Sequence, residues 1–278
     1  MTLAHWTHDL SPFLVRFPEG WPLDGIRFYG VAYLLGFAAG IGLLVLYRRK
    51  NRSPLRRGAE WDLLTYLLVG VIAGGRIGYV VLYDWPAFAA NPLVLFEIWK
   101  GGMASHGGMA GVVAAAWLFA RRHGVSFLRL GDLLATVAPV GLFFGRIANF
   151  VNGELWGRPS GLPWAVVFPG SPPDPVTGLP EPRHPSQLYQ AFGEGVLLFA
   201  WLQWRFWRKP DLPAGRIGAE FLLGYGIVRF VTEFARAPDA PLILGLSRGQ
   251  FYSIPLVLAG LYLLLRTSRP TSGDRDQS

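Results

Sequence analysis

An arginine and two asparagines near the end of an apolar segment are the residues of this chain best suited to binding an anion. Arg146, Asn149 and Asn152 recur at intervals of three residues, which places them along one face of a helix. The residues before Arg146 are apolar enough to cross a membrane, where a charge costs roughly 2.5–3.5 kcal/mol on insertion scales and normally faces a partner or water. A guanidinium with amides beside it therefore predicts a site for a phosphate or a carboxylate.

Other polar side chains within apolar segments have both a functional and a structural interpretation. Arg229 could bind a substrate, or it could pair with Glu233 four residues later on the same helix. Arg76 could bind an anion, or its side chain could extend to the membrane interface. His106 could act as a base, but it lies among glycines, and segments so rich in small residues usually pack against another helix.

Charged residues at other positions are easier to interpret structurally. Glu154 is a candidate partner for an arginine, because a buried guanidinium needs a carboxylate or several acceptors. Asp62 and Asp132 begin apolar segments and are interpreted as helix N-caps. His8 is interpreted as solvated, and the sequence contains no metal-binding pattern. The absence of cysteine excludes disulfides and a thiolate nucleophile within the chain.

Composition predicts an all-α polytopic membrane protein. Apolar residues make up 51% of the chain and charged residues only 16%, and the apolar residues fall in blocks close to the roughly 20 residues needed to cross a bilayer. One integral membrane domain, residues 1–278, accounts for the whole length. Seven membrane-spanning helices are predicted: Phe28–Tyr47, Asp62–Tyr83, Met103–Ala120, Asp132–Val151, Gln190–Trp207, Ile217–Ala235 and Gln250–Arg266.

The distribution of basic residues predicts the orientation. Most of them follow the first, third, fifth and seventh predicted spans, so the positive-inside rule places the N-terminus outside and the C-terminus, with the tail 267–278, in the cytoplasm. The net charge of +8 reflects this asymmetry, and the absence of a basic stripe interleaved with aromatic residues argues against nucleic-acid binding. Residues 1–27 lack the pattern of a cleaved signal peptide and are expected to lie along the outer surface.

The longest polar connection is expected to form a small head on the outer face. Residues 152–187 are rich in proline, which prevents a helix and favours irregular structure. Trp164 to Phe168 could form one short strand. With this topology, the outer half of the membrane contains five candidate residues: Tyr29, Arg76, His106, Arg146 and Arg229.

The segment from Gly145 to Gly157 also resembles the signature of a known family. Its glycine, arginine, two asparagines, glutamate and closing glycine are similar to those of the phosphatidylglycerol-prolipoprotein diacylglyceryl transferases of bacteria. Ala148 stands where glycine is common in related sequences, and no consequence is expected from one methyl group. Further motifs extend the resemblance over essentially the whole chain: Tyr29-Gly30, Gly74 to Tyr79, Ser105 to Gly108, His184 to Tyr189, and Tyr225 to Arg236.

The resemblance implies transfer of the diacylglyceryl group of phosphatidylglycerol to the lipobox cysteine of a prolipoprotein signal peptide. A thioether forms and glycerol phosphate is released, without a cofactor or metal, at the periplasmic leaflet of the inner membrane. Holding the phosphate requires guanidinium donors, and the thiol must lose its proton to a base. The expected roles are catalytic for His106, Arg146 and Arg229, lipid-binding for Tyr29, Arg76, Arg146, Asn149, Tyr225 and Arg229, and supporting for Asn152, Glu154, Gly157 and Glu233.

Three other classes of protein fit the sequence less well. An anion transporter or channel could use Arg76, Arg146 and Arg229 for selectivity, but the arginines gather toward one leaflet and no inverted repeat is evident. A structural scaffold leaves the three intramembrane arginines unexplained. An intramembrane protease lacks a separate pair of serine and histidine, because Ser105 and His106 are adjacent.

Overall fold

The computed structural model describes residues 5–21 and 23–268, most of which are helical. The chain forms two compact units, one of residues 1–42 and 134–278 and the other of residues 43–133. It passes from one unit to the other within α1 (Phe28–Arg49) and within α5 (Phe127–Val151). Residues 269–278, most of the predicted cytoplasmic tail, lie outside the described residues.

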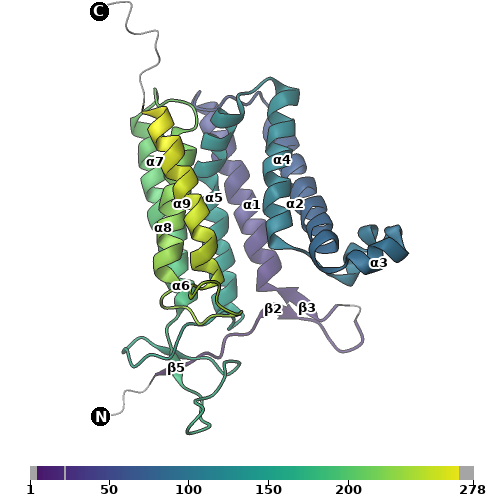
Figure 1. The fold of residues 1–278 in the computed structure, drawn as a ribbon, viewed down its shortest axis with the longest axis vertical. Helices are drawn as coiled ribbons and strands as arrows, with labels where there is room; N and C mark the ends of the chain where they lie inside the picture. The colour runs from purple at the N-terminus through teal and green to yellow at the C-terminus, as the bar shows by residue number, and fades with distance from the viewer. Residues whose placement is uncertain (1–4, 22, 269–278) are drawn as a thin grey trace, which may run out of the picture. The chain divides into compact units, whose positions relative to one another are not determined.

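Helices cover all seven segments that the sequence predicts as spans (Figure 1). Among the described residues, four are long and apolar enough to cross a membrane: α1, α2 (Ala59–Tyr83), α5 and α9 (Arg248–Thr267). The third and sixth segments are α4 (Ser105–His123) and α8 (Arg216–Thr232). The fifth is a continuous run of α6 (Ser186–Gln190), η3 (Ala191–Leu197) and α7 (Leu198–Arg208).

The proposed N-caps at Asp62 and Asp132 are wrong, because both helices begin earlier. Helix α2 starts at Ala59, after Gly58 in a left-handed conformation. Helix α5 starts at Phe127, and the Oγ of Ser126 accepts a hydrogen bond from the Arg129 amide. Serine at this position satisfies a main-chain donor that the first helical turn leaves free. A charged residue at the start of an apolar block therefore gives only an approximate position for the first residue of the helix.

In the unit of residues 43–133, α2 packs directly against α4 through glycine (Figure 1). A Cβ atom added to Gly107 would lie 2.3 Å from the carbonyl oxygen of Gly74 and 2.8 Å from the Cα of Gly78. Main chains can approach this closely only without side chains between them. The packing interpretation of the glycines around His106 is therefore confirmed. Short helical turns connect the two helices: α3 (Trp85–Ala90), η1 (Pro92–Phe96) and η2 (Ile98–Lys100).

Replacement of Gly107 tests this contact. The added methyl group of Gly107→Ala forces main chain away from main chain, so we expect a loss of about 1–3 kcal/mol in stability, the usual range for overpacking. Gly131→Ala in α5 is the matched control, because its Cβ meets nothing within 4 Å and alanine favours a helix by up to about 1 kcal/mol. Thermal unfolding in detergent measures both, and equal midpoints would contradict the close packing.

In the unit of residues 1–42 and 134–278, a helical core supports a small irregular head. Helix α8 lies beside α9 along most of its length (Figure 1). Ala135, Leu198, Leu202 and Ile217 form a buried apolar cluster between α5, α7 and α8. Packing of this kind fixes the rotation of each helix, and therefore the direction of its polar side chains.

The head is built from short strands that come from distant parts of the chain. Strand β1 (Trp6–Thr7) pairs in parallel with β4 (Val166–Val167), which pairs in antiparallel with β5 (Pro182–Arg183). The short strand predicted within Trp164 to Phe168 is confirmed. A second, two-stranded sheet joins β2 (Phe13–Arg16) to β3 (Gly25–Arg27).

The N-terminal segment is attached to the head through His8. This residue is buried, its Nε2 lies 2.7 Å from the carbonyl oxygen of Phe150, and its ring packs on Phe168. The interpretation of His8 as solvated is therefore wrong. The pattern around a single histidine carries no information about a partner 142 residues away.

Candidate anion-binding site

Two arginines from different helices share one buried carboxylate. Both Nε and Nη2 of Arg146 in α5 donate to Oε2 of Glu194 at 3.1 Å. The Nη1 of Arg229 in α8 lies 3.5 Å from Oε1 of the same residue. The Glu194 side chain is fully buried, whereas those of Arg146 and Arg229 remain 15% and 13% exposed. The structure therefore brings together the two arginines that the sequence singled out, and it adds a carboxylate between them.

Glu194 reaches this position because the local helix is unusual. It lies in the middle of η3, a π-helical turn between α6 and α7, a geometry that is rare and often found at functional sites. Glycines flank it on both sides. A Cβ on Gly193 would lie 2.5 Å from the Val228 side chain, and a Cβ on Gly195 would lie 2.7 Å from the Phe143 side chain. The two glycines thus let η3 approach α8 and α5 closely.

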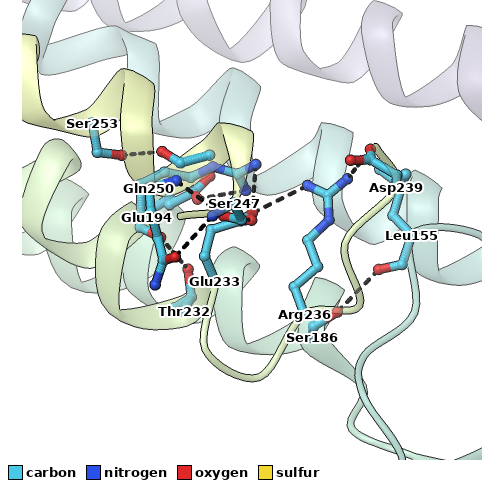
Figure 2. Close-up of polar contacts among 12 residues, drawn as sticks. Leu155, Ser186, Glu194, Thr232, Glu233, Arg236, Asp239, Ser247, Gln250 and Ser253 are labelled. Carbon is cyan, nitrogen blue, oxygen red and sulfur yellow. Dashed lines mark hydrogen bonds and ion pairs between the residues drawn. The ribbon is translucent and has the colours of Figure 1, made fainter. Parts of the chain in front are cut away.

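Glu233 continues the network from Arg229 to the start of α9. Its Oε1 lies 2.7 Å from Nη2 of Arg229, as the intrahelical alternative predicted, and 3.3 Å from Nη1 of Arg236. Its Oε2 accepts a hydrogen bond of 2.7 Å from the Oγ of Ser247, which caps α9 together with Gln250. Figure 2 shows the contacts of Glu233 with Arg236 and Ser247. A carboxylate at a helix N-terminus is favoured by the helix dipole, so Glu233 is held firmly.

A second polar cluster joins the start of α1 to the end of α5. The Nδ2 of Asn149 donates to Oε1 of Glu154 at 2.7 Å, and the Tyr29 hydroxyl contacts both side chains. Glu154 was expected to pair with an arginine. Its side-chain partners in the described structure are instead Tyr29 and Asn149, because the chain turns after Val151 and directs Glu154 back toward α1.

The Glu154 carboxyl makes stability depend on pH. Burial raises its pKa above the ordinary value, so its contribution to stability is full below the ordinary glutamate pKa of about 4.3 and is lost as pH rises through the raised value. We expect the Tm of Glu154→Gln minus the Tm of the wild type to increase as pH rises from about 4 to about 7. Thermal unfolding in detergent measures this difference, with Glu19→Gln as the exposed control; parallel curves would contradict the prediction.

Glycine at position 157 allows three segments to meet beside this cluster. Its amide donates to the carbonyl oxygen of His184 at 2.9 Å, and it forms an isolated bridge with Arg236. A Cβ there would lie 2.4 Å from the His184 oxygen and 2.6 Å from that of Ala235. The Oγ of Ser186 donates to the carbonyl oxygen of Leu155 (Figure 2). The segment that runs from His184 into α6 therefore holds the end of the Gly145–Gly157 signature.

The remaining candidates occupy different surroundings. Tyr225 in α8 stacks on Phe221 and packs against the apolar cluster. The main-chain N–H of Asn152 donates to the carbonyl oxygen of Ala148 in the last turn of α5. His106 is exposed in the first turn of α4, in the unit of residues 43–133.

Arg76 belongs to the same unit as His106 and is buried within it. Its Nε donates to the carbonyl oxygen of Leu95 at 3.2 Å, and its Nη1 donates to that of Gly102 at 3.1 Å. Further bonds reach the carbonyl oxygens of Val94 and Gly101. These carbonyl groups belong to the segment after α2, so the buried guanidinium fixes the connection between α2 and α4.

Several buried polar atoms near Glu194 have no hydrogen-bond partner in the described structure. They are Oε1 of Glu194, Nη1 of Arg229, Oε1 of Gln187 and Nε2 of Gln190. Buried polar groups are normally hydrogen-bonded. Nη1 of Arg229 and Nε2 of Gln190 are donors without a partner, and an unpaired guanidinium donor is suited to an oxygen of an anion. Within residues 5–21 and 23–268, no three histidine, aspartate or glutamate side chains gather as metal ligands.

Comparison with known proteins identifies the family. The family model described as prolipoprotein diacylglyceryl transferase matches residues 21–266. The chain belongs to this family. Relatives named phosphatidylglycerol–prolipoprotein diacylglyceryl transferase include one from Idiomarina loihiensis, 48% identical over 252 residues, which are 89% of this chain and 90% of the relative. Another, from Polynucleobacter asymbioticus, is 48% identical over 272 residues, which are 95% of this chain and 98% of the relative.

The resemblance seen in the sequence is therefore confirmed, but one residue of the arginine cluster was missed. Glu194 lies within the predicted fifth span, as a lone carboxylate between two glycines. A charge inside an apolar segment indicates a partner of opposite charge. The same reasoning that selected Arg146 and Arg229 could have selected Glu194.

Proposed function

We propose that this chain transfers the diacylglyceryl group of phosphatidylglycerol to the thiol of a lipobox cysteine in a prolipoprotein signal peptide. The thiol sulfur forms a bond to the glycerol carbon that carries the phosphate, and the bond between that carbon and its phosphate oxygen breaks. Glycerol phosphate leaves with the bonding electron pair, and the thiol proton passes to a base. Membership in the transferase family supports this activity, and the shared carboxylate of Arg146 and Arg229 supports a site for the leaving phosphate.

The roles proposed for the side chains follow from the charge that develops during cleavage. Negative charge grows on the phosphate oxygens, and preorganised cationic donors stabilise it most when they are shielded from water. Arg146 and Arg229 supply these donors from two helices. Asn149 and Tyr29 orient oxygens of the lipid, while Glu154 fixes their positions through its hydrogen bonds.

The supporting roles fall on residues around these donors. Glu233 anchors Arg229 to the start of α9, and Gly157 allows the main chain at His184 and Ala235 to pack closely against it. Tyr225 and Arg76 are proposed to help hold phosphatidylglycerol, and Asn152 is proposed to support the site. Arg76 already engages four main-chain carbonyl groups, so its contribution would be to hold the connection that follows α2.

His106 is the proposed base for the thiol proton. Histidine titrates near neutral pH, and a positioned base typically contributes about 10²–10⁴-fold. We therefore expect His106→Gln to lower kcat by about that factor without changing the binding of phosphatidylglycerol. A rate measured against pH for both proteins tests the assignment, and full activity in the glutamine variant would end it.

We also propose seven membrane spans in the bacterial inner membrane, with the N-terminus and the head 152–187 on the periplasmic side. One integral membrane domain and a C-terminal tail in the cytoplasm complete this topology. Large apolar side chains such as Leu34, Leu265 and Val231 are exposed on α1, α9 and α8, which supports contact with lipid. The four long apolar helices support the same placement.

The experiment that tests the activity follows the peptide product. Purified full-length protein in detergent is mixed with phosphatidylglycerol and a lipobox peptide, and mass spectrometry follows the peptide. The proposal predicts a gain equal to one diacylglyceryl group, and no gain for a peptide with serine in place of cysteine. Folded protein that leaves the peptide unchanged while moving anions across a vesicle membrane would support a transporter instead.

A further inference from the structure

We propose that Glu194 is an internal anion that competes with phosphate for Arg146 and Arg229 and so promotes release of the product. This inference rests on the transferase activity proposed above. Glu194 would act through the two arginines rather than on the reacting atoms, which makes it a positioning residue. Its carboxylate occupies the space between two guanidiniums that a phosphate would otherwise bridge.

The lengths of the contacts indicate that Glu194 can be displaced. Charge-assisted bonds between nitrogen and carboxylate are usually about 2.7–2.9 Å long, whereas Glu194 meets Arg146 at 3.1 Å and Arg229 at 3.5 Å. Its Oε1 and the Nη1 of Arg229 face each other without a hydrogen bond. By contrast, Glu233 holds the other terminal nitrogen of Arg229 at 2.7 Å. Arg229 is thus anchored by one carboxylate and only loosely contacted by the other.

The reaction itself creates a need for such a competitor. Phosphatidylglycerol carries a phosphodiester with one negative charge, whereas the released glycerol phosphate is a phosphomonoester with a charge of about −1.5 to −2 at neutral pH. Two arginines without a counter-ion would therefore hold the product more tightly than the substrate. A carboxylate that returns to the guanidiniums weakens the binding of the product, because glycerol phosphate then has to break an ion pair in order to stay bound.

The balance of charge around the site also indicates that Glu194 weakens the binding of phosphate. Residues of alternating charge run from the site to the surface: Arg146, Glu194, Arg229, Glu233, Arg236 and Asp239. With Glu194 in place the two arginines and two glutamates nearest the site compensate one another. Removing the Glu194 charge leaves one positive charge uncompensated and creates a stronger binding site for any phosphate.

Glu194→Gln tests the proposal because it keeps the shape of the side chain and removes its charge. The inhibition constant of added glycerol phosphate is measured in the peptide-lipidation assay, together with the KM for phosphatidylglycerol. We expect the inhibition constant to fall by about tenfold or more, the KM to fall less, and kcat to decrease with a burst of the first turnover. A purely structural role would raise KM or lower Tm and leave the inhibition constant unchanged, and that result would overturn the proposal.

Glu220→Gln is the matched control. Glu220 is also a carboxylate shared by two arginines, Arg205 and Arg216, and it lies about two and a half helical turns before Arg229 on α8. The inhibition constant of glycerol phosphate for Glu220→Gln should equal that for the wild type. If Glu194→Gln does not fold, Glu194→Asp keeps the buried charge but shortens the side chain, and a lower inhibition constant is again expected; an unchanged constant would refute the role of Glu194.

A second measurement does not require transfer activity. Inorganic phosphate and glycerol phosphate are titrated into each purified protein, and the rise in Tm reports binding to the folded state. Glu194→Gln should show this rise at about tenfold lower concentration than the wild type. An inactive wild type that nevertheless shows this difference would refute the proposed reaction and leave the internal anion standing. An active wild type without the difference would refute the internal anion alone.

Discussion

Arg146→Lys should lower kcat for transfer by about 10²–10³-fold, which is the usual effect of removing one oxyanion donor. Both Nε and Nη2 of Arg146 bind one oxygen of Glu194, a forked geometry that a lysine ammonium cannot reproduce. Lysine retains the positive charge, so the loss would report geometry rather than charge. The steady-state rate of peptide lipidation measures it.

The control for this change is Arg129→Lys, near the opposite end of the same helix. Arg129 is exposed, and its replacement should leave kcat unchanged. Transfer at the wild-type rate in Arg146→Lys would mean that a single positive charge suffices at this position. The forked arrangement would then have no catalytic importance.

Arg229→Ala should have the second large effect, because it changes both catalysis and stability. Two carboxylates, Glu194 and Glu233, face this guanidinium, and breaking a buried pair by removing one partner typically costs about 3–5 kcal/mol. We expect transfer to fall by at least about 10²-fold and the thermal midpoint to decrease clearly. Activity is measured well below the new midpoint so that the two effects can be separated.

Arg216→Ala on the same helix is the comparison for Arg229→Ala. Arg216 contacts Glu220, which keeps Arg205 as a second partner, so this variant should lose some stability and retain its activity. Guanidinium ion added at low concentration should restore part of the transfer in Arg229→Ala and none in a variant that is merely unfolded. Transfer at the wild-type rate in Arg229→Ala would remove this residue from the site.

The helices could be predicted from the sequence because each is a block of apolar residues of suitable length. Their ends could not, as α2 and α5 show, since turn geometry at Gly58 and capping by Ser126 decide where each helix begins. The pairing of β1 with β4 was also beyond prediction. Two short strands separated by most of the chain carry no mutual signal in a single sequence.

The sequence singled out two charges that interrupt apolar helices, but it did not reveal contacts that depend on irregular backbone. Arg146 and Arg229 were found by depth and charge, and the structure brings them to one carboxylate. Glu194 was missed although it has the same signal. Its contact with both arginines depends on a π-helical turn, which periodic patterns do not reveal, and the partners of Glu154 depend on the turn that follows Val151.

We propose that Arg146 and Arg229 hold the phosphate of phosphatidylglycerol while a peptide thiol displaces it. The most direct test uses phosphatidylglycerol labelled in its glycerol head group and measures release of labelled glycerol phosphate by the wild type and by Arg146→Ala. We predict release that requires the cysteine of the peptide and disappears in the variant. Release that continues without the cysteine, or at an equal rate in Arg146→Ala, would contradict this account.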